Sequence, residues 1–258
     1  MKKIFIDAPL DTMITIPKDT THHLLTVFRH KMEKPVMIGG SDGKTAVYKL
    51  LEVVDGEAKA ELIGHIQDDV TGEVEVVLVQ GFLKADKLEW VLQKTTELNV
   101  HTVYAVPMRN CVVQYKMDKL PQKVQRWEKI MKEASQQCGR SKLPEFVADL
   151  SLAAVIAKEQ AAGSLLLVAY ENEHSLTLKT ALEAWETAIA ESSNSAEPLA
   201  GSQRVVIFIG PEGGLSNDEL TQFEAAGARV VTLGNTILRA ETAAVGAVSM
   251  LQYTLNMD

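Results

Sequence analysis

Cysteine is scarce in this 258-residue chain, and the two that occur, Cys111 and Cys138, are not spaced as metal ligands. No apolar run approaches the ~20 residues that a membrane-spanning helix needs. The start, MKKIFIDAPLD, is basic and briefly apolar, but Asp7, Pro9 and Asp11 come too early for the apolar core of a signal peptide. These absences predict a protein of the reducing cytoplasm, with no membrane segment and no metal centre.

A phosphate-binding loop of the nucleotide-hydrolase type is also missing. Gly39 to Thr45 reads GGSDGKT, but Ile38 stands where such a loop needs its first glycine. The pair Asp42-Gly43 lies between two apolar runs, which is typical of a β-hairpin turn. We therefore interpret this segment as a hairpin.

Basic residues are outnumbered overall, because the chain carries 26 Lys and Arg against 34 Asp and Glu. The excess of acid lies in the last third, whereas residues 109–142 hold nine basic and three acidic residues. Such a local excess suits a surface that contacts phosphates. An ordinary solvated helix face would have the same composition, so charge alone leaves both interpretations open.

Short strands are predicted throughout residues 1–70, at 13–16, 36–38, 45–54 and 57–66. One brief helix is expected over His22–Val27, with Thr20 or Thr21 as its N-cap. Residues 68–72 are the predicted linker to a second region. In that region strands and helices alternate: strands are expected at 73–79, 103–107 and 165–169, and helices at 88–98, 119–137 and 176–190. Residues 80–87 are predicted as a loop, and the polar stretch 191–203 as a surface loop.

The stretch Arg204–Thr254 organises the rest of the prediction. An apolar strand, 204–209, runs into three glycines and a proline within 210–214, and Ser216 with Glu219 forms a capping box for a helix that begins at about Asn217. Gly227 is expected to end that helix, followed by a strand at 229–233, a turn and a long helix at 241–255. This order predicts an α/β fold with a parallel sheet and ligand-binding loops at the carboxyl ends of its strands.

Two glycine-bearing loops in tandem, GPEGGLS (210–216) and LGNTILRAETA (233–243), resemble the cofactor signature of the SPOUT superfamily. Within it the chain resembles the RsmE family, which uses S-adenosyl-L-methionine to methylate N3 of a uridine in 16S (small-subunit) ribosomal RNA. The resemblance implies a SPOUT domain over residues 73–258 with a deep trefoil knot. It also implies a PUA-like RNA-binding β-barrel over residues 1–70, a homodimer, and the small ribosomal subunit or its RNA as partner.

Other segments extend the resemblance over nearly the whole chain. They are the His22–Arg29 segment, the Gln80–Val100 segment and EASQQCGR (133–140). The chain departs from the family pattern at Asn110 and Cys111, which argues against a role for those two side chains.

The resemblance assigns roles to individual residues. We expect the cofactor to be bound by Gly210, Glu212, Gly213, Gly214, Leu233, Gly234, Ile237, Leu238, Thr242 and Ala243. Arg140 or Arg239 is expected to stabilise the negative charge on uracil, and Glu212 to orient the cofactor or accept a proton. Contacts to RNA are expected from Arg29, Lys84, Lys87, Lys94, Lys132 and Arg140.

Three alternatives differ in chemistry. A doubly wound methyltransferase would show a G-x-G-x-G triplet, which this sequence lacks. A SPOUT ribose 2′-O-methyltransferase would share the fold and differ only in the finer match of the motifs. A non-catalytic RNA-binding protein with a degenerate knot domain would not need both loops intact.

Overall fold

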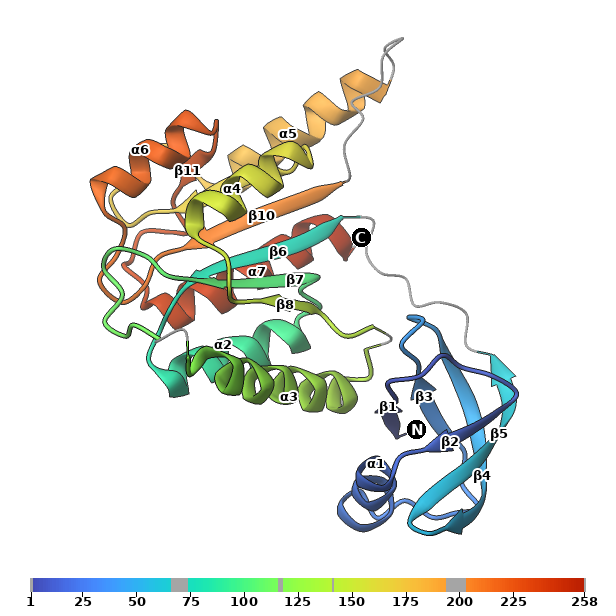
Figure 1. The fold of residues 1–258 in the computed structure, drawn as a ribbon. Helices are drawn as coiled ribbons and strands as arrows, with labels where there is room; N and C mark the ends of the chain where they lie inside the picture. The colour runs from blue at the N-terminus through green and yellow to red at the C-terminus, as the bar shows by residue number, and fades with distance from the viewer. Residues whose placement is uncertain (1, 66–73, 116–117, 141, 194–202, 258) are drawn as a thin grey trace. The chain divides into compact units, whose positions relative to one another are not determined.

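The computed structural model describes residues 2–65, 74–115, 118–140, 142–193 and 203–257. The chain forms two compact units (Figure 1). The first comprises Met1–Thr71 with Met131–Leu143, and the second comprises Gly72–Ile130 with Pro144–Asp258. The predicted linker at 68–72 lies outside the described residues.

The first unit contains a five-stranded mixed sheet, in the order β1-β3-β4-β5-β2. Its strands are β1 (Lys3–Phe5), β2 (Met13–Ile16), β3 (Val36–Gly39), β4 (Thr45–Val54) and β5 (Glu57–His65). β3 and β4 form the predicted hairpin, and the four predicted strands are confirmed. β1 was not predicted, because three residues are too few to show an alternating pattern.

The brief helix of this unit begins earlier than the sequence predicts. α1 (Lys18–His22) starts after Pro17 and continues as a π-helical turn, η1 (His23–Val27). The prediction of Thr20 or Thr21 as N-cap was therefore wrong. The φ of Pro17, −57°, already suits a helix start, which leaves Thr21 free for another contact. The buried Thr21 hydroxyl donates to the carbonyl of Ile16 and accepts from the amide of Ala58, so it ties the helix to the sheet.

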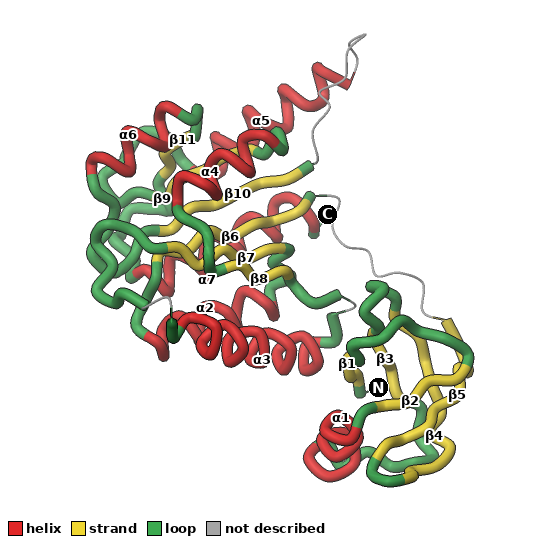
Figure 2. Tube along the Cα trace, in the orientation of Figure 1, coloured by secondary structure: helices red, strands yellow, loops and turns green. Residues whose placement is uncertain are grey.

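The second unit is built on a six-stranded parallel sheet, in the order β11-β9-β10-β6-β7-β8 (Figure 2). Its strands are β6 (Glu75–Gly81), β7 (Thr102–Val106), β8 (Glu145–Val147), β9 (Leu165–Ala169), β10 (Arg204–Ile209) and β11 (Arg229–Val231). The two central strands, β10 and β6, consist mainly of buried Val, Ile, Leu and Phe. Continuous apolar strands of this kind belong in a sheet covered on both faces.

Helices cover both faces of this sheet (Figure 1). They are α2 (Ala85–Glu97), α3 (Leu120–Cys138), α4 (Leu152–Ala161), α5 (Leu178–Ser193), α6 (Asn217–Ala225) and α7 (Ala240–Asn256). The part of α3 from Met131 onward belongs to the first unit. α4 and α6 contribute to one apolar core, in which Phe223 packs against Phe208 at 4.8 Å between ring centroids. On the other face α7 packs against β6, β10 and α2. The parallel α/β architecture predicted from the sequence is confirmed.

Several boundaries differ from the prediction. Gln80 and Gly81, expected in a loop, are the last residues of β6. β8 and α4 were not predicted, and β11 ends two residues earlier than expected. α5 runs on to Ser193, and most of the expected surface loop at 191–203 lies outside the described residues.

Candidate active site

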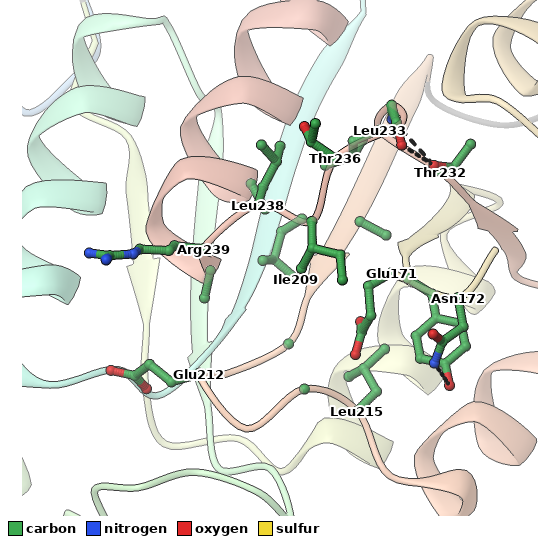
Figure 3. A pocket seen from close by; sticks show the side chains of 18 of the residues that line it. Glu171, Asn172, Ile209, Glu212, Leu215, Thr232, Leu233, Thr236, Leu238 and Arg239 are labelled. Atoms are coloured by element: carbon green, nitrogen blue, oxygen red, sulfur yellow. Dashed lines mark hydrogen bonds between the residues drawn. The ribbon is translucent and has the colours of Figure 1, made fainter. Parts of the chain in front are cut away.

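A cavity of about 720 Å³ lies at the carboxyl end of the parallel sheet (Figure 3). Ala169 at the end of β9, Ile209 at the end of β10 and Thr232 just after β11 all line it. The order of the strands explains this position, because the loops that follow neighbouring parallel strands meet at one edge. Eight of the ten predicted cofactor residues line the cavity: Gly210, Glu212, Gly214, Leu233, Gly234, Ile237, Leu238 and Ala243.

The first glycine loop, 210–214, is tightly folded. Gly214 has φ +71°, and a Cβ there would lie 3.0 Å from Oε1 of Glu171. The left-handed backbone therefore favours glycine at 214, and a Cβ there would also displace the end of the Glu171 side chain. The capping box after the loop is present as predicted: Ser216 Oγ accepts from the amide of Glu219, whose carboxylate accepts from the Ser216 amide. The second carboxylate oxygen of Glu219 accepts from the Arg109 amide at 2.7 Å.

Two amide side chains that the sequence analysis did not select hold this loop in place. Gln80 is fully buried at the end of β6, and its Nε2 donates to the carbonyls of Gly81, Ile209 and Gly210 at 3.0, 3.4 and 3.2 Å. Asn110 donates from Nδ2 to the carbonyls of Gly213 and Gly214. The departure from the family pattern argued against a role for the Asn110 side chain, but in the structure this side chain supports the loop. Gln80 could have been selected from the sequence, because it is a polar residue that follows an apolar run in the same strand.

Glu212 carries the main charge in the first loop. Its Oε1 accepts from the Lys84 amide at 3.2 Å and lies 3.8 Å from Nζ of Lys87. Its Oε2 is buried and has no hydrogen-bond partner among the described residues. Nζ of Lys87 also lies 3.1 Å from Oε2 of Glu241. A buried carboxylate oxygen without a donor is costly, so this atom is a position where a ligand's donor or positive charge is favourable.

Lys87 and Arg239 shape the electrostatics of the same side of the cavity. Burial acts to raise the pKa of Glu241, but hydrogen bonds from its own backbone and from Lys87, together with the charges of Lys87 and Arg239, lower it overall. Arg239 lines the cavity directly before α7 and is exposed. Figure 3 places Arg239 and Glu212 on one side of the cavity and Glu171 and Asn172 on the other.

The second glycine loop follows β11. Thr232 Oγ1 donates to the Gly234 carbonyl at 2.9 Å and accepts from the Gly234 amide, and Gly234 has φ +145°. Ile237 is 80% exposed although it is aliphatic, and Leu238 is half-buried. These side chains and Leu233 form an apolar wall of the cavity, which suits a flat aromatic group.

The other predicted residues lie elsewhere. Gly213 does not line the cavity but faces Asn110, whose carbonyl oxygen would lie 2.6 Å from a Cβ at 213. Thr242 is exposed on α7 and does not line the cavity either. Arg140 belongs to the first unit, where its Nε donates to the Lys142 carbonyl at 3.1 Å. Burial lowers the pKa of Arg140 to about 10, which leaves the guanidinium charged at neutral pH.

The predicted RNA contacts have these environments. Arg29 is exposed and has φ +49°, an uncommon conformation for a residue other than glycine. Lys84 is exposed at the start of α2, and Lys87 lines the cavity. Lys94 pairs with Glu97, and Lys132 lies 3.5 Å from Asp7. None of these contacts tests RNA binding, so these assignments stay predictions.

Across the described residues no three His, Cys, Asp or Glu side chains come together as a set of metal ligands. In the same described ranges, no helix has the length and apolar character required to cross a membrane.

Comparison with known proteins identifies the family. The family described as RNA methyltransferase domain matches residues 71–252. The ribosomal RNA small subunit methyltransferase E of Bacillus subtilis (strain 168) is 28% identical over 239 residues, which cover 93% of this chain and 89% of that protein. The protein of the same name from Mesomycoplasma hyopneumoniae (strain 232) is 27% identical over 246 residues, covering 95% and 96%.

A solved structure shares the fold. The ribosomal RNA small subunit methyltransferase E of Neisseria gonorrhoeae, in a crystal structure bound to S-adenosyl methionine, superposes with a TM-score of 0.81 at 24% identity, and the match covers 100% of this chain and 99% of that one. The chain belongs to the RNA methyltransferase family, among the relatives of ribosomal RNA small subunit methyltransferase E.

Proposed function

We propose that this protein transfers a methyl group from S-adenosyl-L-methionine to N3 of a uridine in small-subunit (16S) ribosomal RNA. The observation that carries this proposal is the cavity at the carboxyl end of the sheet, because both glycine loops predicted to bind the cofactor line it. The relatives named above are ribosomal RNA small subunit methyltransferases.

The residues of the cavity fit this cofactor. A volume of about 720 Å³ is in the range of small-molecule sites. The apolar wall of Leu233, Ile237 and Leu238 suits the adenine ring. The buried, unpartnered Oε2 of Glu212 suits a cationic or hydrogen-bond-donating part of the ligand. Gly210 and Gly214 allow the first loop to fold tightly on its own neighbours, since a Cβ at either position would lie 3.3 or 3.0 Å from other atoms of the protein.

The protein has to position the uracil and stabilise its anion. When bound, S-adenosylmethionine supplies an electrophilic methyl group on a sulfonium sulfur. N3 of uracil can attack only after it loses its proton, so negative charge develops on the ring. Arg239, on the Glu212 side of the cavity, or Arg140 is the cation that we assign to this charge. Glu212 orients the cofactor, and its carboxylate is also a candidate to accept the proton.

The first unit is assigned to RNA binding as a PUA-like module. Its exposed Arg29, together with Lys132 and Arg140, is proposed to contact phosphates, as are Lys84, Lys87 and Lys94 of the second unit. Phosphate contacts of this kind make affinity fall with salt.

We further propose that the second unit is knotted and dimeric. After the edge strand β11, the chain returns through α7 to the central strands β6 and β10 and to α2, a path consistent with a deep trefoil knot. α7 buries Ala247, Val248 and Leu251 in the core, but Met250 and Tyr253 are 42% and 72% exposed on its other face. Apolar side chains on this face support a second copy of the chain as their partner.

The test is methylation of small-subunit rRNA prepared from cells that lack this protein. The purified chain is incubated with that RNA and S-adenosylmethionine, and the digested nucleosides are analysed by mass spectrometry. The proposal expects 3-methyluridine, which should disappear when S-adenosylmethionine is left out. A 2′-O-methylated nucleoside would indicate a ribose methyltransferase instead, and no methylated product together with RNA binding would indicate a non-catalytic role.

A further inference from the structure

One wall of the cavity carries a carboxylate to which the resemblance gives no role. Glu171 follows β9 directly and lines the cavity together with Tyr170, Asn172 and His174. Its Oε1 lies 3.0 Å from the position that a Cβ on Gly214 would take, so the carboxylate lies directly against the first glycine loop. Within the part of the chain that the structure describes, no hydrogen bond or ion pair engages this carboxylate.

The segment that carries Glu171 is fixed at both ends. The Tyr170 amide donates to the Val231 carbonyl at 3.1 Å, and the Thr232 amide donates to the Leu176 carbonyl at 2.9 Å. Between these points Glu173 Oε1 accepts from the amides of Ser175 and Leu176. These bonds join the segment to the residues that lead into the second glycine loop, so Glu171 is held between the two loops. A side chain on such a supported segment is positioned before the ligand arrives.

The distribution of charge separates Glu171 from the other carboxylate of the cavity. Glu212 lies near Lys87 and, in Figure 3, on the side of Arg239, where we place the reacting end. Glu171 lies on the opposite side, next to Asn172. A carboxylate there therefore meets a part of the donor that does not react. Carboxylate oxygens only accept hydrogen bonds, so that part must supply donors.

We propose that Glu171 is a specificity residue whose carboxylate accepts hydrogen bonds from the two ribose hydroxyls of the methyl donor. The inference rests on the proposed function, because it takes the cavity as the cofactor site. Two vicinal hydroxyls present two donors, which match the two oxygens of one carboxylate. The ribose joins the adenine, assigned to the apolar wall of the second loop, to the part of the donor beside the first loop. Glu171 lies between the same two loops. Such a contact rejects analogues without the hydroxyls, because the carboxylate then loses its donors.

The test is a double-mutant cycle between the protein and the ligand, measured by calorimetry on the full chain. The ligands are S-adenosylhomocysteine and its 2′,3′-dideoxyribose analogue, and the proteins are the wild type and Glu171→Ala. Wild type should bind the dideoxy analogue about 10- to 100-fold more weakly, and Glu171→Ala should lose a similar factor for S-adenosylhomocysteine. The variant should then show no further loss with the dideoxy analogue, because the two changes remove the same interaction.

Other results would overturn the inference. One is that Glu171→Ala binds S-adenosylhomocysteine as tightly as the wild type does. Another is that Glu171→Ala loses affinity for the dideoxy analogue by the same further factor as the wild type, so that the two effects are independent. An analogue without the α-amino group should lose the same factor in both proteins, and a loss confined to the wild type would assign Glu171 to the amino group instead. Glu186→Gln, on the exposed surface of α5, is the charge-matched control and should bind both ligands as the wild type does. If the wild type itself does not bind S-adenosylhomocysteine, the cofactor assignment fails, which distinguishes that failure from an error about Glu171 alone.

Discussion

The two ends of the parallel sheet differ in whether their carboxylates have partners. At the amino end, Arg204 donates from Nε and Nη2 to both oxygens of Glu159 at 2.8 and 3.1 Å, and from Nη1 to Glu75. Tyr104 and Ser164 complete the hydrogen bonds of Glu159, which is only 1% exposed. At the carboxyl end, Oε2 of Glu212 and the carboxylate of Glu171 have no such partners among the described residues. The paired carboxylate at the amino end stabilises the fold, and the unpaired carboxylate oxygens at the carboxyl end can still accept hydrogen bonds from a ligand.

Breaking the amino-end cluster should have the largest effect. Arg204→Met would leave Glu159 buried without its cation, which costs about 3–5 kcal/mol of unfolding free energy. Urea unfolding followed by circular dichroism measures this loss. The double variant Arg204→Met with Glu159→Gln removes the unpaired charge and should recover part of the stability. A single variant as stable as the wild type would show that the cluster does not stabilise the fold.

The same variant has a defined dependence on pH. Burial acts to raise the pKa of Glu159, but the hydrogen bond and charge of Arg204 lower it overall. In the wild type this carboxylate therefore adds stability above its unfolded pKa of about 4.3, and that stability is lost as the pH falls through the lower folded value. In Arg204→Met burial dominates and raises the pKa of Glu159. The cost of the substitution should accordingly be largest near pH 7 and shrink towards pH 4.

Comparing substitutions at two glycines should distinguish the effect of backbone strain from an effect on ligand binding. Gly214 and Gly227 have φ of +71° and +74°, but a Cβ at 227 would meet no atom within 4 Å, whereas one at 214 would meet Glu171. Alanine at either position should cost about 1–2 kcal/mol of stability through the left-handed conformation. Only Gly214→Ala should also weaken binding of S-adenosylhomocysteine, by about 10-fold in calorimetry. Equal binding by both variants would argue against the first loop as part of the cofactor site.

The proposed catalytic arginines should affect turnover and leave cofactor binding unchanged. Arg239→Ala and Arg140→Ala should each slow formation of 3-methyluridine by at least ~10-fold, about 1.4 kcal/mol, while S-adenosylhomocysteine binding stays at the wild-type level. The expectation follows from stabilisation of an anion that exists only during the reaction. Single-turnover assays with saturating cofactor make the measurement. An arginine whose loss leaves turnover unchanged has no part in the chemistry.

The sequence predicted the parts of the fold that depend on local pattern. The strand 204–209, the capping box at Ser216 and Glu219, and the left-handed Gly227 each follow from a few neighbouring residues, and the structure has all three. β8 and α4 were missed. β8 has three residues, and its partner β7 lies about forty residues away in sequence, so its pairing cannot be read locally.

The candidate site shows the same division. The loops that line the cavity carry a recognisable motif, so most of their residues were predicted. Gln80 and Asn110 come from two other segments, and each donates a hydrogen bond to the first glycine loop from a position 130 or 103 residues away in sequence. No local pattern reports such contacts. The placement of Arg140, which lies in the other unit, stays a prediction for the same reason.

One amide at the end of β6 has a consequence for protein engineering. Nε2 of Gln80 donates to three carbonyl oxygens, including two where the first glycine loop leaves β10. Glutamate has the same shape but would direct an oxygen at all three. Gln80→Glu, although nearly isosteric, would therefore replace three hydrogen bonds by repulsion between the carboxylate and the carbonyl oxygens at the start of the loop. Only protonation of the new carboxylate would relieve this repulsion.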